Sequence, residues 1–254
     1  MDLKDKVIAI TGAGRGIGAA TAELCTRYGA KVVVADIRDD WGEKVVATIK
    51  AAGGEASYFH VDVSKEAEVE ALVKFAVDKY GKLTGIVNNA ATIVVKKVAD
   101  ITAEEWDRVI RVNLTGVFYG CKHAVRQFQK QGGGGSIVNI GSISAVVGLA
   151  EQAVYCASKG GVVQLSRQIA IDYAKENIRC NIIGPGSVEG DFVQIYLDGQ
   201  SDPSIAKKNI LAAHPIGRMA SPFEVAETIV FMLSDASSFV TGANLQVDGG
   251  YSAI

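Results

Sequence analysis

The chain has 254 residues, of which 48% are hydrophobic and 21% charged, with a formal net charge of −2 and an isoelectric point near 6.0. This balance lacks the basic field that nucleic acids and anionic membranes require, and no apolar run approaches the roughly 18 residues of a membrane helix. The opening segment lacks a secretory signal, and the four cysteines and three histidines are too scattered for a metal site. We therefore expect a cytoplasmic globular protein with no metal, nucleic-acid or membrane partner.

Short β-branched runs alternate with longer amphipathic segments along the chain. The strand-like runs are 6–11, 31–36, 56–61, 83–88, 136–141, 178–183 and 244–249, and several are apolar throughout, as in a sheet buried on both faces. Helical patterns cover 18–29, 66–81 and 102–128, the last of which opens with a capping box formed by Thr102 and Glu105. No linker divides the chain. The alternation predicts a single doubly wound α/β domain of Rossmann type over residues 1–254, with a parallel seven-stranded sheet and helices on both faces.

Glycines cluster in "TGAGRGIG", between the first predicted strand and the first predicted helix. Glycine lets the backbone approach a pyrophosphate closely, and a helix N-terminus offers unpaired N–H groups to it. Two spacings fit a dinucleotide loop: Gly14, Gly16 and Ala19, or Gly12, Gly16 and Gly18. The position of the motif between a strand and a helix favours a dinucleotide site over an ordinary glycine-rich turn.

Asp36 ends the second predicted strand, at the position where a carboxylate can bind the hydroxyls of the adenosine ribose. The same carboxylate would repel a 2′-phosphate, so we expect NAD rather than NADP. Arg15 and Arg38 are the opposing observation, because either guanidinium can pair with a phosphate.

Polar residues also end the next two predicted strands. Asp62 in "HVDVS" is suited to bind the adenine amino group, although a turn-capping role explains it almost as well. In "VNNAA", we expect one of Asn88 and Asn89 to tie strands together and the other to contact the cofactor. Ala90 and Ala91 are small and leave room for a ligand.

Tyr155 and Lys159 lie four residues apart in "YCASK", which places them on one face of a helix. A tyrosine is too weak an acid to act near neutrality unless a nearby charge lowers its pKa, and the Lys159 ammonium can do this. Ser142 follows the fifth predicted strand and can hydrogen-bond a substrate oxygen, and Asn113 is a polar residue within an apolar helix. Together they suggest a proton-transfer site for an alcohol or carbonyl group.

The chain closely resembles the short-chain dehydrogenase/reductase family over almost its whole length. The resemblance rests on "TGAGRGIG", "HVDVS", "NNAA", "RVNLTG", "GSIVNIGSIS", "YCASK", "NIIGPGSV" and "VTGANLQVDGG". It implies a catalytic tetrad of Asn113, Ser142, Tyr155 and Lys159. In that tetrad Tyr155 is the general acid/base, Ser142 orients the substrate oxygen, Lys159 binds the nicotinamide ribose and lowers the tyrosine pKa, and Asn113 holds a water that relays protons.

The resemblance also implies where the cofactor binds. The expected contacts are Gly12, Arg15, Gly16, Ile17, Gly18, Asp36, Ile37, Asp62, Val63, Asn89, Tyr155, Lys159, Pro185, Gly186 and Val188. Two positions depart from the family pattern. Ala91 replaces a glycine, and Gly190 replaces a threonine that contacts the nicotinamide amide.

Residues 187–215 are the expected substrate lid, in which apolar side chains are mixed with a few polar ones. Such a surface fits a small to medium secondary alcohol or ketone, with Gln152 as one polar contact. Two alternatives remain at this point: an NADPH-dependent 3-oxoacyl (acyl-carrier-protein) reductase, and a protein that binds NAD without catalysis. The resemblance further implies a homotetramer.

Overall fold

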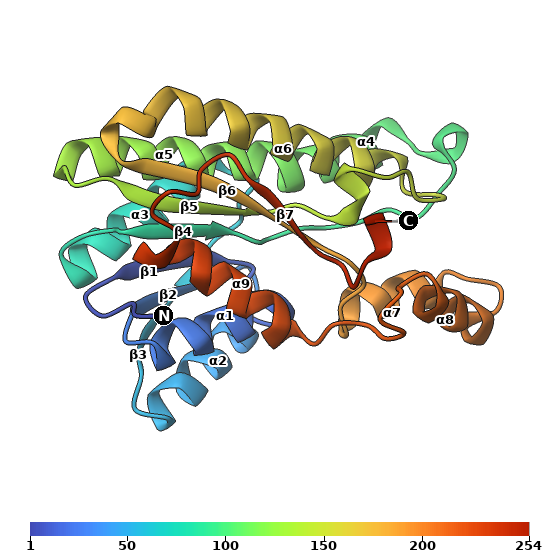
Figure 1. The fold of residues 1–254 in the computed structure, drawn as a ribbon, viewed down its shortest axis with the longest axis horizontal. Coiled ribbons are helices and arrows are strands. Elements are labelled where there is room, and N and C mark those ends of the chain that lie inside the picture. The colour runs from blue at the N-terminus through green and yellow to red at the C-terminus, as the bar shows by residue number, and fades with distance from the viewer. Residues whose placement is uncertain (254) are drawn as a thin grey trace.

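Seven parallel strands form one sheet at the centre of the computed structural model, which describes residues 1–253 (Figure 1). Their order across the sheet is β3-β2-β1-β4-β5-β6-β7, so the chain reverses direction across the sheet between β1 and β4, a switch point of the kind where such folds bind ligands. The strands are β1 (Val7–Thr11), β2 (Lys31–Asp36), β3 (Glu55–His60), β4 (Gly85–Asn88), β5 (Gly135–Ile140), β6 (Ile178–Pro185) and β7 (Asn244–Val247). The predicted parallel sheet is confirmed, with each strand found close to its predicted range.

Helices cover both faces of this sheet (Figure 1). One layer contains α1 (Gly16–Arg27), α2 (Asp39–Ala51) and α9 (Pro222–Leu233); the other contains α3 (Glu66–Tyr80), α4 (Ala103–Ile110), α5 (Gly116–Gln131) and α6 (Ala153–Tyr173). Alternate residues of each strand face opposite layers: Ile8 and Ile10 pack in the first core, and Val7 and Ala9 in the second. Two further helices, α7 (Asp191–Asp198) and α8 (Pro203–Ala212), lie outside both layers at one end of the molecule.

The segment predicted as one helix over 102–128 is divided in the structure. The capping box at its start is present, since Glu105 N–H donates to Thr102 Oγ1 at 3.2 Å and Thr102 N–H donates to Glu105 Oε2 at 3.1 Å. After α4, however, residues Arg111–Thr115 form a π-helical turn before α5 begins. Such turns are frequent at functional sites, and this one contains Asn113.

Candidate active site

The carboxyl ends of the central strands open into one cavity of about 1130 Å³. It is lined by the ends of β1, β2, β4, β5 and β6 and by the segment that contains α7 and α8. Most residues expected at the site line this cavity: Gly12, Arg15, Gly16, Ile17, Asp36, Ile37, Asp62, Val63, Asn89, Ser142, Tyr155, Lys159, Pro185, Gly186 and Val188. Gly18 and Asn113 do not, and each has another role.

The loop from β1 to α1 has the geometry of a phosphate cradle. Gly12 and Gly16 have φ values of +62° and +56°, a conformation that other residues rarely adopt. A Cβ atom built on Gly16 would meet nothing within 4 Å, so the backbone there is open to a ligand. The first turn of α1 has no side-chain cap from Arg15 and no acidic residue, which leaves its N–H groups and positive dipole end to an anion. These features fit the pyrophosphate of a dinucleotide.

Gly18 packs directly against Gly12 of this loop and against Asn89. A Cβ atom there would lie 2.3 Å from the Gly12 carbonyl oxygen and 2.6 Å from Asn89 Nδ2. Gly18 therefore has a packing role, because only glycine lets α1 approach β1 this closely, and its contact with the cofactor stays a prediction. Asn89 contributes to the same arrangement by donating to the carbonyl groups of Thr11 at 3.0 Å and Gly12 at 2.9 Å.

Asn88 and Asn89, at the end of β4, have different positions in the structure. Asn88 is buried and donates to Asn139 Oδ1 on β5 at 2.8 Å, which ties these strands together. Asn89 lines the cavity. At the end of β3, Asp62 also lines the cavity, but its Oδ1 accepts from the Ser64 N–H and hydroxyl groups at 3.0 and 2.7 Å. One carboxylate oxygen of Asp62 thus stabilises a turn, as the alternative interpretation had it.

Asp36 lies at the end of β2 with its carboxylate fixed at both oxygens. Gly14 N–H donates to Oδ2 at 2.8 Å and Arg38 N–H donates to Oδ1 at 3.0 Å. The side chain is buried yet lines the cavity. A fixed carboxylate of this kind can accept hydrogen bonds from a ribose diol.

Trp41 is the centre of a cluster that the sequence did not indicate. The Arg15 and Arg38 guanidinium carbons lie 4.3 and 4.4 Å from its ring centroid, within cation–π range. Both arginines are also paired with carboxylates: Arg38 donates twice to Asp40 at 3.0 Å, and Arg15 pairs with Asp191 at the start of α7. Their charges are therefore largely compensated at the adenosine end of the cavity.

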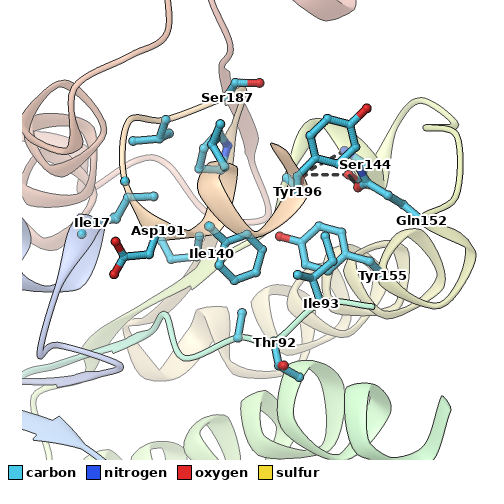
Figure 2. A pocket seen from close by; sticks show the side chains of 18 of the residues that line it. Ile17, Thr92, Ile93, Ile140, Ser144, Gln152, Tyr155, Ser187, Asp191 and Tyr196 are labelled. Atoms are coloured by element: carbon cyan, nitrogen blue, oxygen red, sulfur yellow. Dashed lines mark hydrogen bonds between the residues drawn. The ribbon is translucent and has the colours of Figure 1, made fainter. Parts of the chain in front are cut away.

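The other end of the cavity contains Ser142, Tyr155 and Lys159. Ser142 follows β5, and its Oγ accepts from Ser144 N–H at 3.1 Å. Lys159 is 2% exposed, and its Nζ donates to the Ile140 carbonyl at 2.7 Å and lies 5.6 Å from the Tyr155 ring centroid. Figure 2 shows Tyr155 beside Ile93 and near Ser144 and Gln152. The helix thus brings the phenol and the amine to the cavity together, as their spacing predicted.

Burial controls the protonation of both groups in this structure. Burial raises the pKa of Tyr155, and the Ser142 hydroxyl opposes this only in part. Burial also lowers the pKa of Lys159 to about 8, because the charged amine loses its hydration. Burial is thus the main influence on the pKa of Tyr155 in this structure, and the lowering by Lys159 stays a prediction.

Replacing Lys159 with methionine should change how protein stability depends on pH. The pKa of Lys159 falls from 10.5 to about 8 on folding, so the unfolded chain binds more protons between these values and wild-type stability rises with pH across this window. Relative to Lys159→Met, the wild-type free energy of unfolding should increase by roughly 3 kcal/mol from pH 8 to pH 10.5. Urea unfolding at fixed protein concentration measures this free energy at each pH. Lys207→Met, on the exposed face of α8, is the control, and an equal slope in both variants would contradict the burial argument.

Asn113 is fully buried and does not reach the cavity. Its Oδ1 accepts from Thr92 N–H at 2.8 Å, and its Nδ2 donates to the Thr92 carbonyl at 2.9 Å and to Ser158 Oγ at 3.2 Å. The side chain therefore joins the chain after β4 to α6, the helix that carries Tyr155 and Lys159. The sequence indicated that Asn113 belongs to the site, but it did not show that its side chain contacts Thr92 and Ser158 outside the cavity lining.

The segment 187–215 extends over both ends of the cavity. Gly190, which departs from the family pattern, precedes α7 with φ +137°, a conformation in which a threonine would be strained. The next residue, Asp191, pairs with Arg15 of the phosphate loop, and the Phe192 ring lies 5.8 Å from that of Tyr155. The start of α7 thus contacts the two regions expected to hold the cofactor and the substrate.

His214 anchors the other end of this segment. Its Nδ1 is 2.7 Å from the Ile210 carbonyl, its Nε2 accepts from Ser187 N–H at 3.1 Å, and its ring packs on Tyr251. The histidine therefore fixes the loop after β6, where Pro185, Gly186 and Val188 line the cavity. The sequence gave no sign of this role, because its partners lie far apart in the chain.

The fold and the cavity define a Rossmann-type protein with a dinucleotide cradle joined to a serine–tyrosine–lysine site. A family model described as enoyl-(acyl carrier protein) reductase matches residues 12–252. The chain is 42% identical to 2-(S)-hydroxypropyl-CoM dehydrogenase 3 of Xanthobacter autotrophicus, covering 99% of this chain and 98% of that protein. It is 38% identical to cyclohexanol dehydrogenase of Acinetobacter sp., covering 98% and 96%.

Solved structures give the same result. The crystal structure of levodione reductase superimposes with a TM-score of 0.95 at 34% identity, covering 99% of each chain. The chain therefore belongs to the short-chain dehydrogenase/reductase family and is an oxidoreductase whose relatives use nicotinamide cofactors. Among residues 1–253, no helix has the length and apolarity needed to cross a bilayer, and no group of three or more acidic, histidine or cysteine side chains is placed to hold a metal ion.

Proposed function

We propose that the protein is an NAD-dependent dehydrogenase of secondary alcohols that also reduces the corresponding ketones. The observation that carries the proposal is that one cavity is lined by Asp36 and by Ser142, Tyr155 and Lys159. The relatives support the same reaction class, since their names include cyclohexanol, cyclopentanol and cis-4-hydroxycyclohexanecarboxylate dehydrogenases.

The side chains at the catalytic end have complementary roles in this reaction. When bound, NAD would supply a nicotinamide ring as the hydride acceptor for the carbinol carbon. Ser142 turns its hydroxyl from Ser144 to the substrate and donates a hydrogen bond to the substrate oxygen. Tyr155 removes the hydroxyl proton during oxidation and returns it during reduction. The Lys159 ammonium stabilises the phenolate form of Tyr155. Asn113 keeps α6 in register with the Thr92 segment, and the proton-relaying water expected beside it stays a prediction.

The preference for NAD rests on the carboxylates at the adenosine end. Asp36 lies where a residue that binds a 2′-phosphate would be expected. The two nearby arginines, Arg38 and Arg15, are already paired with Asp40 and Asp191 respectively. A 2′-phosphate would therefore meet a fixed negative charge and no free guanidinium.

An NADPH-dependent reductase of acyl-carrier-protein thioesters is the second candidate, favoured by the description of the matching family model. NADH formation from NAD with a panel of secondary alcohols, repeated with NADP, separates the two. Turnover with NAD supports the proposal. Turnover confined to NADPH and acyl thioesters would replace it with the second candidate, and tight NADH binding without any turnover would favour a binding protein without catalysis.

We also propose that the chain forms a homotetramer through α4, α5 and α6. Three large apolar side chains are exposed on these helices: Trp106 at 41%, Phe118 at 43% and Ile171 at 77%. A contiguous apolar patch that includes these side chains would be typical of an interface. Light scattering should give four times the chain mass of 26.7 kDa. Phe118→Glu should lower that mass, whereas Phe239→Glu, outside these helices, should not; a monomeric wild type would contradict the proposal.

A further inference from the structure

A line of polar groups extends from the catalytic serine along one wall of the cavity. The Ser142 hydroxyl donates to Ser144 Oγ at 3.1 Å, and the Ser144 hydroxyl lies 3.5 Å from Gln152 Oε1 (Figure 2). All three residues line the cavity. The contact from Ser144 to Gln152 is at the outer limit of a hydrogen bond, so either group can exchange it for a ligand oxygen.

The Gln152 side chain has no evident structural task. Gln152 is the N-cap residue of α6, yet its side chain makes no capping bond. Within residues 1–253 its amide nitrogen has no hydrogen-bond partner, while its backbone pairs with the Lys96 segment. An amide donor on a residue that lines the cavity, not used by the fold, is placed to bind a ligand.

The surroundings of these polar groups are apolar. Ile93, Leu149, Phe192 and Val193 line the same cavity, and Figure 2 shows Ile93 beside Tyr155. A hydrocarbon ring or short chain fits such walls. A polar group among apolar walls discriminates well, because a substrate that lacks a matching oxygen leaves it unpaired.

No cation is placed to receive an anionic substrate among the described residues that line this cavity. Arg15 and Arg38 lie against Trp41 at the adenosine end, and Lys159 donates to the Ile140 carbonyl. Both ring nitrogens of His214 have partners. The carboxylates of Glu189, Asp191 and Asp202 line the cavity as well. Desolvating a carboxylate, sulfonate or phosphate of the substrate here would have no compensating charge.

We propose that the natural substrate is an uncharged cyclic secondary alcohol with a second oxygen on its ring, a diol or hydroxyketone, and that Ser144 and Gln152 bind this second oxygen. The inference rests on the proposed function and specifies its substrate class. The reacting hydroxyl would give its proton to the Tyr155 phenolate, and the carbon that bears it would give its hydride to NAD, so that this group becomes a carbonyl. The second oxygen keeps its bonds throughout.

The test compares kcat/KM for cyclohexanol, cyclohexane-1,2-diol, cyclohexane-1,4-diol and 4-hydroxycyclohexanecarboxylate, with NAD in excess. The better diol should exceed cyclohexanol by at least about tenfold, the contribution expected of one well-placed hydrogen bond. The carboxylate should not exceed cyclohexanol. In Gln152→Met, which keeps the length of the side chain, the diol-to-cyclohexanol ratio should fall toward one, mainly through KM for the diol. Gln200→Met replaces another glutamine that lines the cavity and should keep the wild-type ratio.

The outcomes separate this inference from the proposed function. Oxidation of cyclohexanol with no advantage for either diol would overturn the inference and leave the alcohol dehydrogenase intact. The inference is also overturned, and the alcohol dehydrogenase left intact, if the carboxylate is the best substrate or if the diol advantage survives in both Gln152→Met and Ser144→Ala. If none of the alcohols is oxidised although NADH binds, the proposed function fails, and the inference fails with it.

Discussion

Replacing Tyr155 with phenylalanine should lower kcat for alcohol oxidation by roughly 10²- to 10⁴-fold, the usual contribution of a positioned acid/base group. The Kd for NADH should change little, because the change removes one oxygen and keeps the ring that packs against Phe192 at 5.8 Å. Stopped-flow or steady-state absorbance of NADH measures the rate, and fluorescence titration of NADH measures the binding.

Tyr196→Phe is the matched control for this prediction. Tyr196 lines the same cavity and loses the same hydroxyl group, but it lies on α7 and outside the predicted tetrad. Its kcat should stay within about threefold of wild type, as for substitutions that remove no essential group. If Tyr155→Phe keeps wild-type kcat, or if both variants lose activity equally, Tyr155 is not the acid/base residue.

Local patterns explain why much of the site could be located from the sequence. The glycine spacing, the acidic residue at the end of β2 and the tyrosine–lysine pair on α6 each depend on neighbouring residues within one element or one turn. A parallel sheet then brings the strand ends to one edge, which collects Asp36, Asn89 and Ser142 around the same cavity. The family resemblance strengthened these inferences because its motifs coincide with those strand ends.

Contacts between distant segments explain what the sequence did not reveal. Trp41 holds Arg15 from the phosphate loop, and His214 joins Ile210 to Ser187. Neither pairing has a periodic signal, since each depends on how separate elements pack. The break in the helix after α4 was missed for the same reason: Asn113 turns inward to Thr92, and the helical pattern of 102–128 does not record that contact.

The protonation of the site could not be judged from the spacing of residues in the sequence. Two groups one helical turn apart suggest mutual tuning, but spacing does not reveal how far each is removed from water. In the structure both side chains are deeply buried, and loss of hydration raises the pKa of Tyr155 and lowers that of Lys159.

Replacing Asp36 with serine should shift cofactor preference toward NADP. The wild type should use NAD far better, because the carboxylate held by Gly14 and Arg38 N–H groups would face the 2′-phosphate. Two like charges about 4 Å apart near a protein surface repel by roughly 4 kcal/mol. The ratio of kcat/KM for NADP to that for NAD should therefore rise by at least roughly a hundredfold in Asp36→Ser. Serine can still accept one of the two N–H groups, so the loop should keep its shape.

The two paired arginines allow a second step in this experiment. Arg38 donates to Asp40 twice, so adding Asp40→Asn to Asp36→Ser releases the guanidinium for a 2′-phosphate and should lower KM for NADP further.

Asp39→Asn is the matched control for Asp36→Ser. It removes the same charge from the same turn, but its carboxylate is bound to Tyr58 and His60 and does not line the cavity. If Asp39→Asn shifts the preference as much as Asp36→Ser, the selectivity depends on the general charge of this region. If only Asp36→Ser does so, it depends on one carboxylate at the position of the ribose.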